Sequence, residues 1–239
     1  MQHRNNAAKR MLAAAVCILA LAQLSACSGM GAGASSASVR PAASGQSQAA
    51  FEEQSSAQPA PASGLVAGQV LQGADGDIHY SYYLPESYDS NRAYPMVVVM
   101  PGYDMMWFGE SSSEANLQWN GFWAWTKLDE EMIVVSAQLT DWGETSARQA
   151  IELTEYFLAN FAVDPARVYA AGYSAGGETM SRAVAMRPDL YAAYLHGASQ
   201  WDGSFAPVAE NGVAVYIFMA EHDEYYGSQK ARDAYEGLR

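Results

Sequence analysis

The chain has 239 residues, and 50% of them are hydrophobic, which is enough to form at least one domain with a buried core. Acidic residues outnumber basic residues by 26 to 13, so the formal net charge is -13 at pH 7. So acidic a surface repels phosphate backbones, and we therefore exclude nucleic acid as a partner.

The first 26 residues have the pattern of a secretory signal peptide. The first ten are basic and contain no acid, and residues 11–22 form an apolar run that is too short to cross a bilayer as a mature helix. Leu24–Cys27 then resembles the box at which bacterial lipoproteins are cleaved and lipidated. A plain signal peptide with a coincidental cysteine is the alternative. We expect lipid on Cys27, including palmitate, and a location in the cell envelope, on the outer face of a bacterial membrane.

The segment that follows the signal, residues 27–64, reads as a flexible tether. Ala, Ser, Gly, Gln and Pro dominate it, and such a composition cannot bury enough apolar surface to fold. Cys17 lies in the signal and Cys27 is the expected lipidation site, so no cysteine is left for a disulfide, a metal site or a thiol nucleophile. We expect neither a metal nor a cofactor.

From residue 65 to residue 239, segments with strand patterns alternate with segments with helix patterns. An early strand with alternating polarity is typical of antiparallel pairing, and the strands that are apolar throughout are typical of a parallel sheet covered on both faces. The pattern therefore predicts an α/β fold. The expected strands are Ile78–Leu84, Met96–Met100, Met132–Ser136, Val168–Gly172, Tyr191–Leu195 and Val213–Met219, and the expected helices are Ser146–Phe161, Gly176–Met186 and a helix that begins after Ser228.

A Gly-x-Ser-x-Gly motif, Gly172–Gly176, lies between one of these strands and the helix after it. The motif alone is weak evidence of catalysis, but its position at a strand-to-helix turn strengthens that evidence. The turn strains the backbone at the serine and exposes its hydroxyl above the sheet, beside a helix N-terminus that favours negative charge. We therefore expect Ser174 to be a nucleophile. A glycine-rich turn without chemistry is the alternative.

Three segments together, Asp164–Tyr169, Gly172–Gly177 and Arg187–Ala193, resemble the α/β-hydrolase superfamily. The most similar branch contains polyhydroxybutyrate-depolymerase-like, feruloyl-esterase-like and prolyl-oligopeptidase-like lipoproteins and secreted esterases. The resemblance extends from about Ile78 to residue 239. It implies a three-layer α/β-hydrolase sandwich with a mostly parallel central sheet, and a catalytic domain over residues 65–239.

The resemblance also implies the partners of the serine. The amides of Ala175 and Tyr103 would form the oxyanion hole, although Pro101 stands where the family usually has histidine. Asp223, which follows the strand Val213–Met219, would be the acid that orients the catalytic histidine. Asp202 is the reserve candidate for the acid.

The catalytic histidine is not evident in the sequence. There are four histidines: His3 leaves with the signal, His79 lies in an early strand, His196 follows a strand, and His222 adjoins the proposed acid. His196 or His222 as the base remains an alternative. Family members continue with another strand and helix. We therefore expect this chain to be a truncated fragment that lacks them, with the catalytic histidine beyond Arg239.

The leading hypothesis is a lipid-anchored serine hydrolase that cleaves small or polymeric carboxylic esters through an acyl-enzyme. A serine peptidase is a variant of this hypothesis. A catalytically inactive protein that binds glycan or polymer is the rival. Aromatic and methionine side chains crowd the loops at the expected catalytic end, where they could line a cleft, although most of them should be ordinary packing: Tyr103, Met105, Met106, Trp107, Phe108, Trp119, Phe122, Trp123, Trp125, Trp142, Trp201, Tyr225 and Tyr226.

Overall fold

The computed structural model describes residues 63–107 and 114–239. The expected signal peptide, residues 27–62 of the expected tether, and Phe108 lie outside these ranges. Seven strands and five α-helices follow one another along the described chain: β1 (Gly64–Gly73), β2 (Gly76–Leu84), β3 (Tyr94–Met100), α2 (Asn120–Trp123), β4 (Ile133–Gln138), α3 (Glu144–Asn160), β5 (Val163–Tyr173), α4 (Ala175–Met186), β6 (Ala193–Gly197), α5 (Phe205–Glu210), β7 (Ala214–Phe218) and α6 (Gln229–Gly237). Three short 3₁₀ helices, Tyr103–Met105, Ala115–Gln118 and Trp125–Lys127, connect β3 to β4 together with α2.

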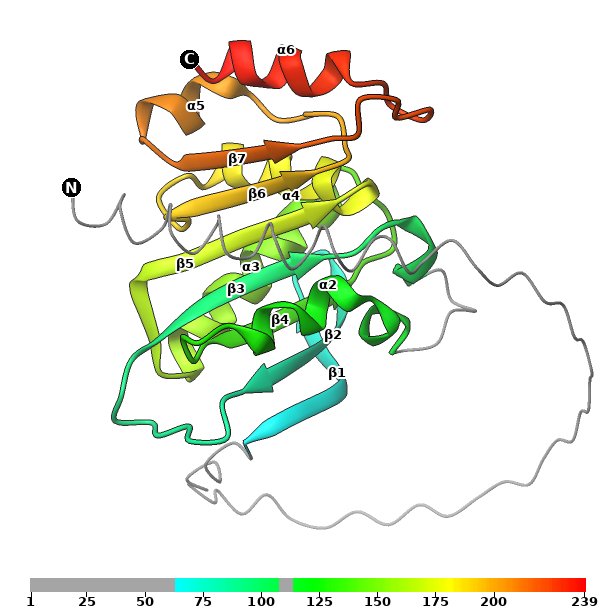
Figure 1. Ribbon diagram of the computed structural model, residues 1–239. Coiled ribbons are helices and arrows are strands. Elements are labelled where there is room, and N and C mark those ends of the chain that lie inside the picture. Colours follow the sequence, from blue (N-terminus) through cyan, green and yellow to red (C-terminus); the bar gives the residue numbers. More distant parts are fainter. Residues whose placement is uncertain (1–62, 108–113) are drawn as a thin grey trace, which may run out of the picture.

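All seven strands form one sheet in the order β1-β2-β4-β3-β5-β6-β7 (Figure 1). β2 pairs antiparallel with β1 and with β4, and every pair from β4 to β7 is parallel. The carboxyl ends of the parallel strands therefore meet at one edge of the sheet, which is where α/β sheets place their ligands.

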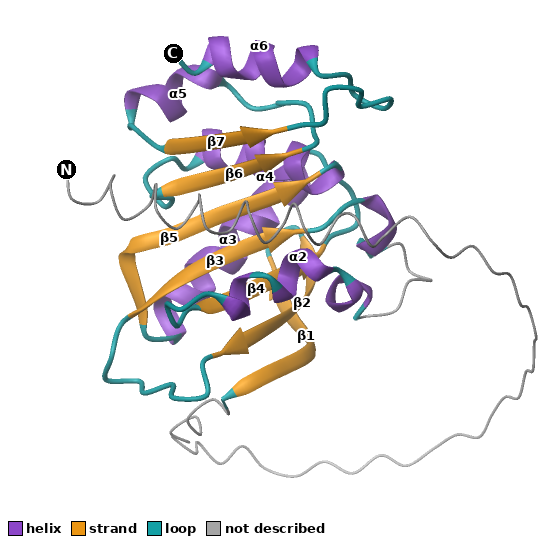
Figure 2. Ribbon diagram, viewed as in Figure 1, coloured by secondary structure: helices purple, strands orange, loops and turns teal. Residues whose placement is uncertain are grey.

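Helices cover both faces of this sheet, and each covered face has its own apolar core (Figure 2). β3 shows the division most clearly, because all seven of its residues are buried. Met96, Val98 and Met100 pack in the core under α3 and α4, whereas Val97 and Val99 pack in the core that Phe122 of α2 enters. The predicted three-layer α/β sandwich with a mostly parallel sheet is confirmed.

Most of the predicted elements are present, with three differences. β1 was not predicted. β5 begins five residues before the predicted strand Val168–Gly172, and its pairing with β3 shifts between Val163 and Val168. β7 was expected to be buried, but its residues are only partly buried and Tyr216 is 40% exposed. The reason is its position, since within the described residues β7 pairs only with β6 and forms an edge of the sheet.

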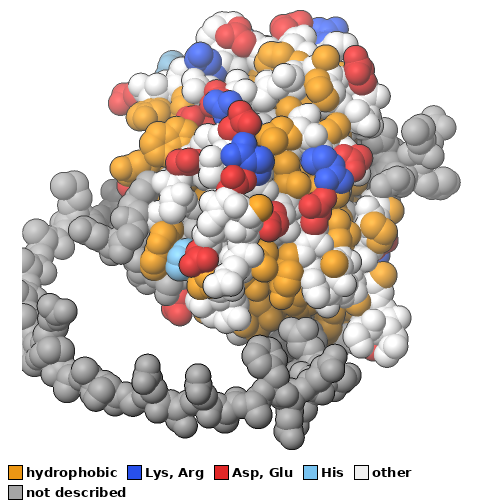
Figure 3. All heavy atoms as spheres, turned by 180° about the vertical axis from the view of Figure 1, so that it is seen from behind, with side chains coloured by type: hydrophobic (Ala, Val, Ile, Leu, Met, Phe, Trp, Pro, Cys, Tyr) orange, Lys and Arg blue, Asp and Glu red, His pale blue; other side chains and the backbone are white. Residues whose placement is uncertain are grey.

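Positive and negative side chains are mixed on the face shown in Figure 3, where basic side chains lie beside acidic ones. Arg148, Arg182 and Arg187 each form an ion pair with a carboxylate. In the part of the chain that the structure describes, no helix has the length and apolar character needed to cross a membrane.

Candidate active site at the end of strand β5

The chain reverses sharply at Ser174, between β5 and α4. Ser174 has φ 54° and ψ -126°, a left-handed conformation that L-residues rarely adopt. Its backbone is held on both sides, because its N–H donates to the Gly197 carbonyl at 3.1 Å and its own carbonyl accepts from Gly177 N–H at 2.7 Å and from the Ser199 hydroxyl at 2.7 Å. Strain that is held in this way is a mark of functional sites. The predicted strand, turn and helix are therefore present, while the role of Ser174 stays a prediction.

The glycines of the motif are required by close packing. A Cβ on Gly172 would lie 2.5 Å from the Gly176 carbonyl oxygen, and a Cβ on Gly176 would clash with the carbonyl oxygens of Met100 and Pro101. Only residues without a side chain let α4 begin so close to the ends of β5 and β3. The two strand ends and the helix N-terminus thus converge on Ser174.

The segment after β3 lies against the serine on one side. A Cβ built on Gly102 would be 3.6 Å from the Ser174 Cβ, so the backbone that leads into Tyr103 passes beside the serine. Ala175 is the first residue of α4, so its N–H has no acceptor within the helix. The oxyanion-hole role of these two amides stays a prediction.

Asp223 lies in the loop between β7 and α6, where its carboxylate organises the backbone. Its Oδ1 accepts the N–H groups of Tyr225 (3.1 Å), Tyr226 (2.7 Å) and Gly227 (3.2 Å). These contacts leave its second oxygen available to orient another group. Asp202, the reserve acid, is instead in an ion pair with Arg182 at 3.0 Å. The geometry favours Asp223 over Asp202.

None of the three histidines in the described residues is placed as the base of Ser174. His196 is fully buried in β6, where Tyr194 Oη and the Ser199 carbonyl engage its two ring nitrogens at 2.8 and 3.2 Å, and burial lowers its pKa to about 4. His79 stacks on Trp107 and lies on β2, which β4 and β3 separate from β5. His222 is exposed, and no hydrogen bond joins it to Ser174.

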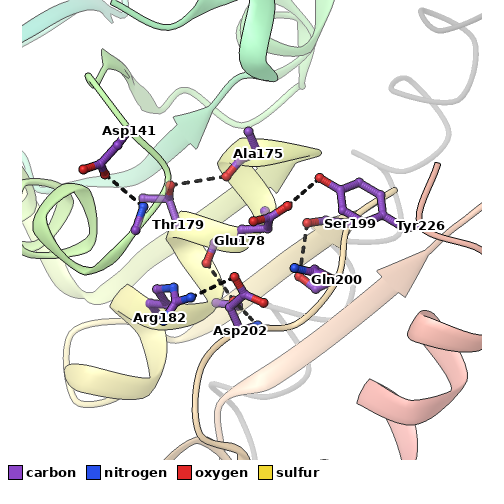
Figure 4. Close-up of polar contacts among 12 residues, drawn as sticks. Asp141, Ala175, Glu178, Thr179, Arg182, Ser199, Gln200, Asp202 and Tyr226 are labelled. Atoms are coloured by element: carbon purple, nitrogen blue, oxygen red, sulfur yellow. Dashed lines mark hydrogen bonds and ion pairs between the residues drawn. The ribbon is translucent and has the colours of Figure 1, made fainter.

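Sequence reasoning missed two residues that contact the serine site. Tyr226 lies on the Asp223 loop and donates its hydroxyl to Glu178 Oε1 at 2.6 Å (Figure 4). Glu178 lies in the first turn of α4 and is only 6% exposed. The spacing of Glu178, four residues after Ser174, was a usable signal, because such residues share a helix face. Nothing in the sequence indicated the contact with Tyr226, 48 residues away.

The surroundings of Glu178 alter its acidity. Burial raises the pKa of this carboxyl, and proximity to and a hydrogen bond with Asp202 raise it further. The hydrogen bond from Tyr226 and the charge of Arg182 act in the opposite direction. Burial and the bond to Glu178 raise the pKa of Tyr226, and the nearby Ser174 hydroxyl lowers it. Glu178 is therefore a carboxyl group that holds a proton more readily than usual.

Several of the aromatic residues expected near the site belong to the core. Trp119, Phe122 and Trp125 are buried in the apolar core on the α2 face of the sheet. Tyr103 and Trp142 remain exposed and meet edge to face, with their ring centroids 5.6 Å apart. Tyr103 directly follows Gly102, which lies beside Ser174, so this pair of rings is close in the chain to the serine site.

A hollow among the described residues lies between β7 and α6 rather than above Ser174. It has a volume of about 810 Å³ and runs along the open edge of β7, between that strand and α6. Val215, Ile217 and Tyr235 contribute apolar walls. Within the described ranges, no group of three or more His, Cys, Asp or Glu side chains could hold a metal ion.

Comparison with known proteins supports the architecture. The sequence profile of the prolyl oligopeptidase family matches residues 136–238, which include both Ser174 and Asp223. No curated protein sequence matches the chain significantly. Among solved structures, a thermostable esterase superposes with a TM-score of 0.62 at 18% identity, over 73% of this chain and 51% of that one. The chain therefore spans about half of the length of this esterase.

Two further structures cover more of their own length. The ferulic acid esterase of the anaerobic fungus Anaeromyces mucronatus has a TM-score of 0.54 at 18% identity, over 73% of this chain and 78% of its own. A lipase/esterase from Lactobacillus plantarum has a TM-score of 0.51 at 14% identity, over 73% and 84%. The chain has an α/β-hydrolase fold.

The strained turn at Ser174 should lower the free energy of unfolding. Glycine adopts a positive φ without a Cβ clash, so we expect Ser174→Gly to have a free energy of unfolding about 1 kcal/mol higher than that of Ser174→Ala. Chemical denaturation of the two variants under the same conditions measures the difference. A Ser174→Ala variant as stable as Ser174→Gly would contradict a strained backbone at this residue.

Proposed function

We propose that the protein is a serine hydrolase that cleaves carboxylic esters, with Ser174 as its nucleophile. The observation that carries the proposal is the left-handed turn at Ser174 between a parallel strand and a helix N-terminus. This turn is how α/β-hydrolases expose a nucleophilic hydroxyl. The three esterases with similar folds support the choice of an ester substrate.

In the proposed reaction, Ser174 Oγ attacks the ester carbonyl and an acyl-enzyme forms as the alcohol departs. The amides of Ala175 and Tyr103 would donate hydrogen bonds to the oxyanion, and each such donor typically lowers the barrier by about 2.7–4 kcal/mol. Water then releases the acid. The exposed pair of Tyr103 and Trp142 would contact the substrate on this side, and it suits an apolar or aromatic acyl group.

None of the three histidines in the described residues is placed as a general base for Ser174. Asp223 Oδ1 accepts three backbone N–H groups, so Oδ2 would be the oxygen that orients a histidine ring. We therefore expect the described site to turn over esters only weakly.

A peptide substrate is the second candidate. The profile of the prolyl oligopeptidase family, which matches residues 136–238, specifically favours it. Ester and amide cleavage use the same nucleophile and oxyanion hole, and the described geometry serves both. Parallel assays of an ester and an amide of the same acyl group distinguish the two candidates.

The proposed place of action is the bacterial cell envelope, where lipid on Cys27 would anchor the domain through its tether. The basis is the residue pattern before Cys27. We expect cells fed an alkyne analogue of palmitate to label the protein, and we expect Cys27→Ser to abolish this labelling. Cys17→Ser, which alters only the apolar run, is the control. Equal labelling of the wild type and Cys27→Ser would contradict the anchor.

A fluorophosphonate probe tests the proposed nucleophile directly. We expect the folded chain to be labelled slowly, with the adduct mapped to Ser174 by peptide mass spectrometry and absent from Ser174→Ala. Ser204→Ala, which removes an exposed hydroxyl at the start of α5, should label like the wild type. A folded chain that never reacts would favour the catalytically inactive binding protein. Ester turnover as fast as in other esterases would contradict the expected weak activity of the described site.

A further inference from the structure

Glu178 connects two parts of the candidate site that lie far apart in the sequence. Its N–H donates to the Ser174 carbonyl at 3.2 Å in the first turn of α4. Its Oε1 accepts the Tyr226 hydroxyl at 2.6 Å, across 48 residues (Figure 4). The backbone and the side chain of this one residue therefore join the serine turn to the loop between β7 and α6.

The same loop carries Asp223, and its backbone is organised around that carboxylate. Asp223 Oδ1 accepts three N–H groups of the loop at distances between 2.7 and 3.2 Å, and one of them belongs to Tyr226. The backbone of Tyr226 is thus bound to Asp223, while its side chain is bound to Glu178. A shift of Tyr226 relative to α4 would consequently move Asp223 relative to Ser174.

The other polar groups near Glu178 have partners of their own. Arg182 forms an ion pair with Asp202 at 3.0 Å, and the Asp202 N–H donates to Ser181 Oγ at 2.9 Å. The loop after β6 is therefore held on α4 by contacts that do not involve the Glu178 side chain. Glu178 itself is only 6% exposed, and a buried carboxylate is costly unless a donor compensates it. The hydroxyl of Tyr226 supplies such a donor.

We propose that Glu178 is a positioning residue that, through Tyr226, holds the Asp223 loop in place against the helix that begins at Ser174. This rests on the proposed function and deepens it, because a histidine ring that serves Ser174 must be oriented by an acid at a fixed position. Glu178 takes no part in making or breaking bonds. It acts on the reaction through the position of Asp223.

Hydrogen–deuterium exchange at the amides of residues 225–227, the loop amides, measures how firmly the loop is held. Tyr226→Phe removes the donor and keeps the ring, and Glu178→Ala removes the acceptor. We expect each variant to lower the protection of the loop amides about tenfold, because a hydrogen bond to a charged group is lost. The double variant should lower it no further, since both residues contribute to one hydrogen bond. Glu178→Gln keeps an acceptor oxygen and should retain most of the protection.

The pH dependence of this protection separates a carboxylate acceptor from a side chain that only fills space. A carboxylate accepts a hydrogen bond more strongly than a neutral carboxyl. Burial raises the pKa of Glu178, the bond from Tyr226 lowers it, Asp202 raises it and Arg182 lowers it, with a net rise. We therefore expect the wild-type loop amides to lose protection as the pH falls through this raised pKa. Asp223 can also take up a proton, and the difference between the wild type and Glu178→Gln isolates the contribution of Glu178.

Matched controls lie in the same loop. Tyr225→Phe and Glu224→Gln change exposed side chains and should leave the protection of the loop amides within about twofold of the wild type. The amides of β3 and β5 report the stability of the whole domain and should be equally protected in every variant. If Glu178→Ala does not fold, Tyr226→Phe carries the comparison.

The catalytic consequence is measured as the rate at which a fluorophosphonate labels Ser174 in the presence of added imidazole, which is the free form of a histidine ring. We expect imidazole to speed the labelling of the wild type. Asp223→Asn keeps an acceptor for the loop but loses the second carboxylate oxygen, so it should abolish the increase. Tyr226→Phe should reduce the increase, and Tyr225→Phe should leave it unchanged.

The outcomes separate this proposal from the proposed function. If the loop amides of Tyr226→Phe are as protected as those of the wild type, or if imidazole speeds both equally, the positioning role is wrong and the serine hydrolase stands. If the wild type labels but does not respond to imidazole, the role of Asp223 is wrong and the positioning role fails with it. If the folded wild type never labels, the proposed function fails, and Glu178 is then only a structural contact whose strength the exchange still measures.

Discussion

The site depends on one constraint, the reversal of the chain at Ser174. A left-handed backbone there costs on the order of 1–3 kcal/mol, and it persists because its surroundings fix it. The N–H of Ser174 is bound by β6, and its carbonyl is bound by α4 and by Ser199. Apolar cores on both faces of the sheet hold β5 and α4 in the positions that require the turn. The Ser174 hydroxyl, the N–H of Ala175 and the N-terminus of α4 consequently lie close together.

The sequence predicted best those features that depend on residues close together in the chain. Apolar runs such as Met96–Met100 predicted buried parallel strands, and the glycines around Ser174 predicted a tight strand-to-helix turn. β1 escaped prediction because it is an edge strand whose residues are mostly partly buried or exposed, so its apolar signal is weak. The half-burial of β7 also follows from its place in the sheet rather than from its composition, which is as apolar as that of a central strand.

Long-range contacts decided the details that the sequence could not give. From the sequence alone, the aromatic residues in the loop after β3 could line a substrate cleft or belong to the core. The structure places three of them in the core: Trp119, Phe122 and Trp125. In the same way, Tyr226 was grouped with the cleft aromatics, whereas its hydroxyl donates to the buried Glu178. His196 illustrates the converse. A histidine near the end of a strand suggests chemistry, but its burial and its two occupied nitrogens make it structural.

A crystal structure of the chain after reaction with an organophosphonate would test the central claim most directly. The account predicts phosphorus on Ser174 Oγ, an unchanged positive φ at this residue, and a phosphonyl oxygen about 3 Å from the amide nitrogens of Ala175 and Tyr103. An adduct on another residue, a relaxed Ser174 backbone, or a phosphonyl oxygen turned toward solvent and away from both amides would contradict it.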